Sequence, residues 1–97
     1  MDFKRENPAC SFTVPDKVTV RMQLNYFSMA SLKPSPDLWE KLWEAAKTII
    51  TDWQCELFPD FKTSLDDMTD PQITSTIVWA AIEVKKHIDA LEIVPKN

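Results

Sequence analysis

Apolar and polar residues alternate most regularly in the segment KVTVRMQLNYF, residues 17–27. A period of two is typical of a β-strand with one buried and one exposed face. The apolar positions are Val18, Val20, Met22, Leu24 and Tyr26, and the polar positions between them are Thr19, Arg21, Gln23 and Asn25. The pattern therefore predicts a strand in this segment.

This strand needs a partner, and the sequence offers only a short one. Residues 11–14 could form a strand that is joined to it through Pro15 and Asp16, a pair that suits a type I turn. Type I turns splay the strands of a two-residue hairpin, and so short a partner cannot reach Leu24. We therefore expect a strand or β-ribbon over about residues 11–27, completed by a second copy of the chain or by a partner's strand.

A first helix is predicted over about residues 36–57. Apolar residues recur there at spacings of three and four, as they do along one side of an α-helix. Ser35 and Pro36 suit the N-cap and the first helical position. At the other end Pro59 prevents the helix from continuing, because proline lacks the backbone N–H that the helix needs.

A second helix is predicted over about residues 71–92. Asp70 and Pro71 repeat the start signal of the first helix, and Pro95 sets an outer limit. The resulting fold class is α+β: an N-terminal strand or ribbon packed on two long antiparallel helices.

A chain of 97 residues is long enough for one modest core and too short for two. We therefore assign residues 12–97 to a single domain. Residues 1–11 are mostly polar or charged and include a proline. We expect them to form a flexible N-terminal arm.

The apolar arcs of both predicted helices are wider than the roughly 100° that a one-sided helix needs. One strand and two helices cannot cover both arcs within a monomer, so we expect a surplus apolar surface. Tryptophan is enriched among the residues that anchor protein interfaces, which points to Trp39 and Trp43. The alternative is that both indoles fill the core. The predicted protein interface consists of Met22, Leu24, Tyr26, Trp39, Trp43 and Ile50.

Composition removes several classes of function. The chain has no glycine, so it has no glycine-rich phosphate loop, no dinucleotide-binding fingerprint and no nucleophile elbow. Turns must instead be built on its 7 prolines. The net charge of −4 gives no overall attraction to nucleic acid or to an anionic membrane.

The residues that could carry out chemistry lack the partners that chemistry needs. His87 is the only histidine, and no nucleophile motif accompanies it. Four aspartates precede the second helix, but their spacing does not match a calcium loop. They are Asp60, Asp66, Asp67 and Asp70. We therefore expect a non-catalytic protein with no metal and no cofactor.

Cys10 and Cys55 have no metal-type spacing. We expect two reduced thiols in a cytoplasmic protein, with a disulfide between them as the alternative in an oxidising compartment. The sequence contains neither the apolar core of a signal peptide nor a run of about 18 apolar residues that could span a membrane. Membrane association is therefore not expected.

Short pieces of the chain resemble ribbon-helix-helix repressors, dimers that pair one strand from each chain. KVTVRM is similar to the strand of that family, PDLWEKLWEAA to its first helix and TIVWAAIEV to its second. The resemblance implies that the polar face of the strand contacts DNA bases, and this face consists of Thr19, Arg21, Gln23 and Asn25. The chain departs from the family in its longer first helix and in the acidic start of its second.

These observations favour a small intracellular interaction or regulatory protein that binds a protein partner and forms a homodimer. Two binding modes are available, namely strand addition at an exposed edge and docking on an apolar helix face. A DNA-binding regulator is the alternative function.

Overall fold

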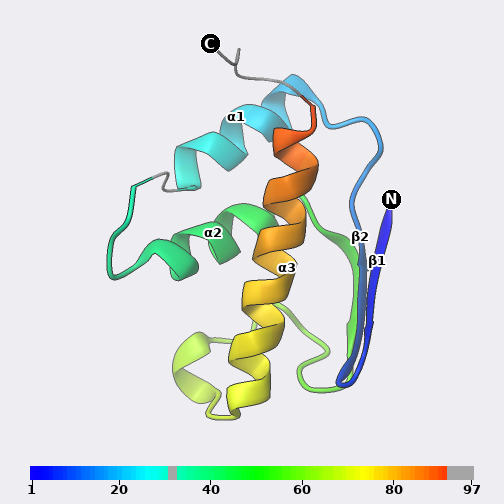
Figure 1. Cartoon of the computed structure of the whole chain (residues 1–97), viewed down its shortest axis with the longest axis vertical. Helices are drawn as coiled ribbons and strands as arrows, with labels where there is room; N and C mark the ends of the chain where they lie inside the picture. Colours follow the sequence, from blue (N-terminus) through cyan, green and yellow to red (C-terminus); the bar gives the residue numbers. More distant parts are fainter. Residues whose placement is uncertain (31–32, 92–97) are drawn as a thin grey trace.

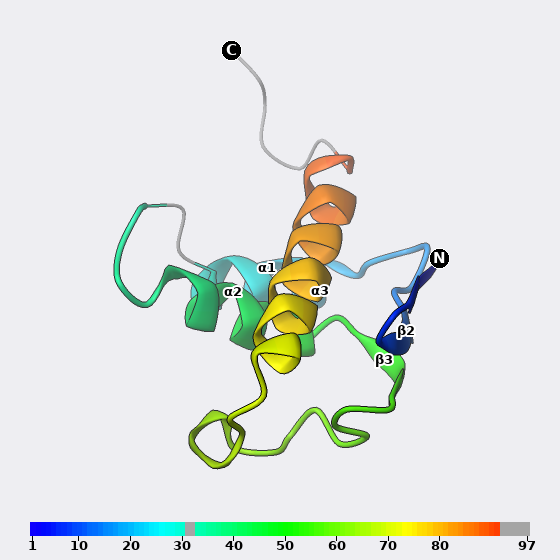
Figure 2. The ribbon, with the colours of Figure 1, turned by 60° about the horizontal axis from the view of Figure 1, so that its bottom comes forward.

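The computed structural model describes residues 1–30 and 33–91. Within them, a three-stranded sheet lies on one side of three α-helices (Figures 1 and 2). In chain order the elements are β1 (Asp2–Glu6), β2 (Ala9–Thr13), α1 (Val20–Met29), α2 (Leu38–Lys47), β3 (Thr51–Cys55), the 3-10 helix η1 (Leu65–Asp67) and α3 (Pro71–Asp89). The α+β class is confirmed. The prediction of two long antiparallel helices is not, because α1 and α2 have 10 residues each and only α3 has 19 among the described elements.

The strands β1 and β2 form an antiparallel hairpin that runs from Asp2, opposite Thr13, to the turn. Asn7 and Pro8 make this two-residue turn, and the peptide bond between them is cis. A turn built on proline agrees with the absence of glycine from the sequence. Residues 1–11, where a flexible arm was predicted, thus contain β1 and the start of β2.

β3 pairs antiparallel with the other side of β2, so the strand order is β1-β2-β3. The register shifts by one residue, which sets Asp52 and Trp53 of β3 against Phe12 of β2 as a β-bulge. Asp52 has a φ of 51°, in the left-handed region that glycine favours. Aspartate tolerates this region better than most other residues, and the chain offers no glycine for it.

The segment 17–27 is not a strand, which corrects the prediction. It contains the N-cap and most of α1, and the hydroxyl of Thr19 accepts a hydrogen bond of 3.2 Å from the backbone N–H of Met22. An alternating pattern also contains residues four apart, and these lie on one side of a helix. The structure buries Val18 and Tyr26 and half-buries Met22, while Val20 is 69% exposed. The period of two therefore concealed a helical period.

The predicted helix over residues 36–57 is also wrong, because β3 occupies its second half. α2 ends at Lys47, and a turn leads into a run of β-branched residues at positions 48–51. Such side chains lose rotamer freedom in a helix and pack well in a sheet. The change from helix to strand therefore follows the local side-chain chemistry.

The start of α2 differs from the prediction by two residues. Asp37, and not Ser35, occupies the N-cap position, and Leu38 is the first helical residue. Ser35 instead donates a hydrogen bond of 2.7 Å to the carboxylate of Asp37. That bond and the bond from Lys41 lower the pKa of Asp37 below its usual value.

α3 confirms the predicted second helix over most of its length. Asp70 is its N-cap, where the carboxylate accepts a hydrogen bond of 2.9 Å from the backbone N–H of Gln72, and Pro71 is the first helical residue. The helix ends at Asp89. The last predicted residue, at position 92, lies outside the described residues.

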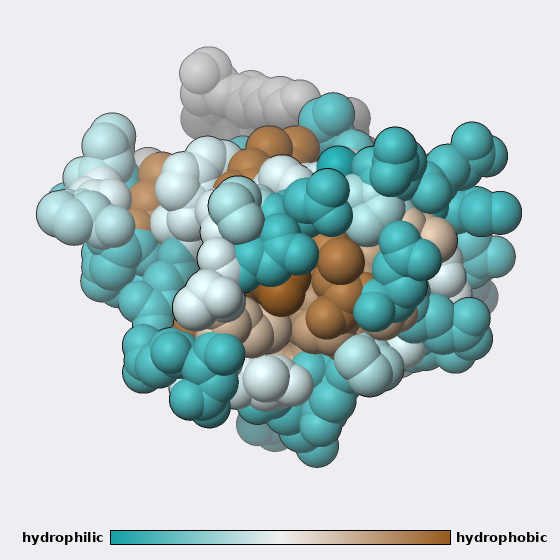
Figure 3. Space-filling view, turned by 90° about the horizontal axis from the view of Figure 1, so that it is seen from below, coloured by the Kyte–Doolittle hydropathy of each residue, from teal (hydrophilic) through white to brown (hydrophobic). Residues whose placement is uncertain are grey.

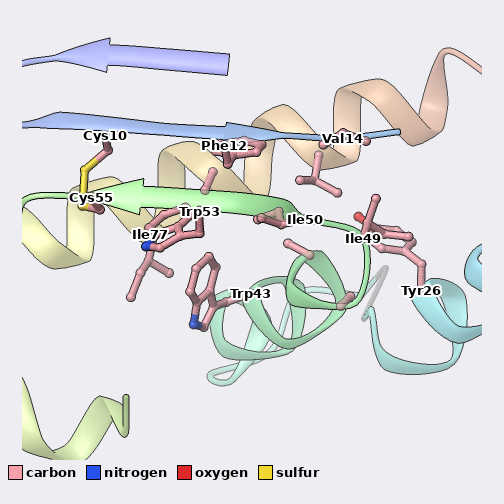
Figure 4. Packing of buried hydrophobic residues seen from close by; sticks show 14 of the residues in the cluster. Cys10, Phe12, Val14, Tyr26, Trp43, Ile49, Ile50, Trp53, Cys55 and Ile77 are labelled. Carbon is pink, nitrogen blue, oxygen red and sulfur yellow. A yellow bond between two sulfur atoms is a disulfide. The ribbon is translucent and has the colours of Figure 1, made fainter. Parts of the chain in front are cut away.

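Aromatic side chains fill the space between the sheet and the helices (Figure 4). Phe12 of β2 stacks on Phe3 of β1 and on Trp53 of β3, with ring centroids 5.0 and 5.9 Å away. Trp79 of α3 packs edge-on against Phe12 at 5.2 Å. The indole N–H of Trp53 donates a hydrogen bond of 3.0 Å to the carbonyl of Phe58, which closes the loop after β3 over the core.

Cys10 and Cys55 form a disulfide between β2 and β3, so the prediction of two free thiols is wrong. The two cysteines are direct cross-strand partners, and both side chains are buried. The bond links positions 45 residues apart in the sequence. The cytoplasmic location, which assumed reduced thiols, stays a prediction.

We expect the disulfide to contribute strongly to stability. Closing a loop of this length removes about 4 kcal/mol of conformational freedom from the unfolded chain in the chain-entropy model. Replacing both cysteines by alanine should therefore lower the free energy of unfolding by about 2–4 kcal/mol, as measured by urea denaturation. Reductant should lower the unfolding midpoint of the natural chain and leave that of the double variant unchanged. If reductant left the unfolding midpoint unchanged in the natural chain as well as in the double variant, this expectation would be contradicted.

Candidate functional site

Trp39 is the most conspicuous exposed aromatic residue of the helical layer. It lies in the first turn of α2, and 45% of its surface is exposed. A pocket adjoins it on each side. We call Trp39 together with these two pockets the Trp39 surface.

The first pocket has a volume of about 290 Å³ and lies among α2, η1 and the first half of α3. α2 contributes Trp39 and Trp43, and α3 contributes Ile73 and Ile77. The loop before α3 adds two further apolar side chains, Leu65 and Met68. Seen from below, this end of the molecule has hydrophobic atoms near the centre of a largely hydrophilic face (Figure 3).

The second pocket has a volume of about 330 Å³ and lies on the other side of Trp39. Leu38 and Leu42 of α2 and Ile82 of α3 line it, together with Pro34 and the two lysines Lys33 and Lys85. Trp39 therefore stands between two pockets along the groove that α2 and α3 form. The Trp39 surface is apolar over most of its length.

Trp43 lies behind Trp39 and supports the first pocket. Its side chain is 99% buried, since only 1% of its surface is exposed. The ring packs against Trp53 and Phe58, with centroids at 5.6 and 6.2 Å, and the ammonium group of Lys47 lies 5.7 Å from the ring centroid. These contacts fix the orientation of the indole.

The indole N–H of Trp43 has no hydrogen-bond acceptor among the described residues, whereas that of Trp53 is bonded. The nitrogen is also not among the fully enclosed polar atoms without a partner, which are Tyr26 Oη and His87 Nε2. Figure 4 shows it on the side of the ring that points away from Trp53. Trp43 is one of the residues that line the first pocket, so a donor without a described acceptor belongs to a lining residue.

Three carboxylates stand at the first pocket, and we call them the acidic rim: Glu40, Asp66 and Asp70. None of the three forms an ion pair with a described residue. The lysines of the neighbouring helices are engaged elsewhere, in the pairs Lys41–Asp37, Lys47–Glu44, Lys85–Asp89 and Lys86–Glu83. No described cation therefore pairs with the rim, and of its three carboxylates only that of Asp70 is offset, by the backbone N–H of Gln72 at the start of α3.

The structure separates the six predicted interface residues. Trp39 and Trp43 meet at the first pocket. Tyr26 and Ile50 are buried in the core, and Met22 packs against it. Leu24 is 64% exposed on the outer side of α1.

The four residues predicted to contact DNA lie on α1 or at its cap and not on a ribbon. Thr19 caps the helix, and the side-chain amide of Gln23 donates a hydrogen bond of 2.8 Å to the carbonyl of Val18. Arg21 and Asn25 are exposed on the helix. The strand that the ribbon-helix-helix comparison required is therefore absent from this segment.

The sequence pattern missed the part of the site that comes from the loop before α3. In this loop the sequence pattern pointed only to the aspartates, and not to Leu65 and Met68. Both side chains pack partly against the core and line the first pocket. Their apolar character in an otherwise polar loop was the available signal.

Metal-binding and membrane-spanning features were also sought in residues 1–30 and 33–91. No group of three or more histidine, cysteine, aspartate or glutamate side chains in these ranges could hold a metal ion. No described helix is both long and apolar enough to cross a membrane.

The chain was compared with protein-family models, with curated proteins and with solved structures, and none of the three comparisons found a match.

Tyr26 is the only tyrosine, and its hydroxyl lies buried without a hydrogen-bond partner among the described residues. Burial, assisted by the negative charge of Asp89, raises the pKa of Tyr26 to about 12. The unfolded chain ionises this hydroxyl near pH 10. Between about pH 10 and 12, loss of the proton therefore favours unfolding.

We predict that the folded protein shows a phenolate absorbance transition near pH 12, and the urea-unfolded protein one near pH 10. The free energy of unfolding should fall as the pH rises through this window. Tyr26→Phe should remove that part of the fall. At neutral pH it should leave stability unchanged or raise it by about 1 kcal/mol, because it removes an unsatisfied buried hydroxyl. A folded-state transition near pH 10 would contradict the prediction.

Proposed function

We propose that this chain is a small, non-catalytic interaction protein that binds a partner protein through the Trp39 surface. The observation that carries the proposal is a half-exposed tryptophan between two apolar pockets on a rigid pair of helices. Tryptophans that pack into pockets of a partner, or frame pockets for it, are frequent energetic anchors of interfaces. Helix-in-groove docking is the corresponding recognition mode.

The helical groove is a better docking site than the edge of the sheet. The sheet has two edge strands: the exposed residues of β1 include Asp2, Lys4 and Glu6, and those of β3 include Asp52 at the bulge. Charged side chains on an edge strand oppose the addition of another strand. The apolar groove carries no such obstacle to a helix or loop of a partner.

The DNA-binding alternative required a strand at residues 17–27. Because this segment is mostly helix α1, we do not propose that function.

The decisive experiment removes the exposed indole. Trp39→Ala should abolish the co-purification of a stoichiometric partner when the tagged chain is isolated under native conditions from the cells that produce it. The fold should persist, because the side chain is half exposed, and circular dichroism can check this. Met29→Ala is the matched control, because Met29 has the same 45% exposure and lies on α1.

Quantitative mass spectrometry measures the amount of partner that is isolated with the natural chain, with Trp39→Ala and with Met29→Ala. The natural chain and Met29→Ala should retain the same partner protein in equal amount. The amount retained by Trp39→Ala should be at least about tenfold lower, as expected for an anchor residue. A partner that is retained equally by all three would overturn the role of Trp39.

We further propose that the chain self-associates through α1, where Val20 and Leu24 are exposed one turn apart. Sedimentation equilibrium should then give a mass that rises with concentration above that of the 11.2 kDa monomer. Leu24→Glu should return the monomer mass, because it places a charge in the contact, and Trp39→Ala should not. A monomer at every concentration would contradict self-association without affecting partner binding.

A further inference from the structure

We infer that the first pocket receives a basic, amphipathic segment of the partner, with an apolar side chain in the pocket and a lysine or arginine at the acidic rim. This inference rests on the proposed function and specifies its partner. Three features of the site support it: the size of the pocket, the indole N–H of Trp43, which has no described acceptor, and the carboxylates of the acidic rim, which pair with no described cation.

The size of the first pocket suits an anchoring side chain. The first pocket has about 290 Å³ and is open to the groove. Ile73 and Ile77 offer an apolar wall on one side, and Trp39 offers one on the other.

The indole of Trp43 supplies a fixed hydrogen-bond donor. The ring is held by Trp53 and Phe58, while its N–H has no acceptor among the described residues. A carbonyl oxygen of a docked segment would satisfy it. A buried ring with such a donor is preorganised for this bond, so little freedom is lost when the bond forms.

The negative charge of the site favours a positively charged segment of the partner. Glu40 projects from α2, Asp66 from η1 and Asp70 from the start of α3, so carboxylates of three elements meet at one pocket. No described cation pairs with them. A lysine or arginine could also lie against the exposed face of Trp39, which attracts cations. An acidic segment would be repelled by the same groups.

The test begins with a library of random 12-residue peptides displayed on phage, selected against the disulfide-bonded protein. The selected peptides should combine a large apolar residue with at least one lysine or arginine and should carry net positive charge. The strongest peptide is then synthesised with a fluorophore, and its dissociation constant is measured by fluorescence anisotropy at several salt concentrations.

Charge removal at the rim should weaken this peptide. The triple variant Glu40→Gln, Asp66→Asn and Asp70→Asn should raise the dissociation constant by about tenfold at low salt and flatten its salt dependence. Asparagine at position 70 keeps the helix cap, because it caps as well as aspartate. The matched control neutralises three acids of the sheet, Asp2→Asn, Glu6→Gln and Asp52→Asn, and should leave binding nearly unchanged.

The indole N–H groups report the position of the peptide. The chain has 4 tryptophans, so ¹⁵N-labelled protein gives one indole signal for each. The signals of Trp39 and Trp43 should shift when the peptide is added. The signal of Trp53 should stay, because its N–H is bonded within the core.

Each other outcome decides the question. Selection of uncharged or acidic peptides, or of none, would overturn the inference. A peptide that loses affinity with Trp39→Ala but not with the triple rim variant would overturn the role of charge and leave the proposed function intact. A peptide whose affinity neither Trp39→Ala nor the triple rim variant changes, and which does not shift the indole signal of Trp43, binds outside the first pocket and would overturn the inference. The native isolation with Trp39→Ala then tests the proposed function separately.

Discussion

Trp53 joins the sheet to the helices, because its ring contacts Phe12 of β2 on one side and Trp43 of α2 on the other. Its N–H also holds the carbonyl of Phe58, which draws the loop after β3 against the core. The first pocket depends on this arrangement, since Trp43 forms part of its wall and packs against Trp53. Trp53 is buried in the core, and through Trp43 it supports the surface that we propose for binding. The bulge contributes to the same arrangement. It contains Asp52 and Trp53, which both lie opposite Phe12 of β2.

The sequence was sufficient for the fold class, for α3 and for much of the burial, but not for β1, α1 or β3. In the segment 17–27, strict alternation satisfied the strand period, while Val18 and Tyr26 also satisfied a helical one. Periodicity could not choose between them. The choice was made by the local hydrogen bond at Thr19 and by the burial of Tyr26 in a core that elements distant in the sequence build.

The segment 36–57 failed in a different way. Ile49 and Trp53 are four residues apart, a helical spacing, and both are buried, but Trp53 lies on a strand. Helical spacing and strand spacing coincide over such short intervals, so burial was predictable and the element was not. Of the candidate interface residues, the structure brings only Trp39 and Trp43 together at a pocket. Their neighbours Leu65 and Met68 stand out only as apolar residues in a polar loop, and the pocket to which they belong is made by tertiary packing.

The link between Cys10 and Cys55 has a topological consequence. It closes a covalent ring that contains most of β2 and all of α1, α2 and β3. A protease that cut the chain once between α1 and α2 would open this ring without releasing either fragment. Both pieces would stay tied at β2 and β3, with α3 still attached to the second of them. The groove between α2 and α3 lies entirely on that second piece, so a nicked molecule would keep both walls of the Trp39 surface on one continuous stretch of chain.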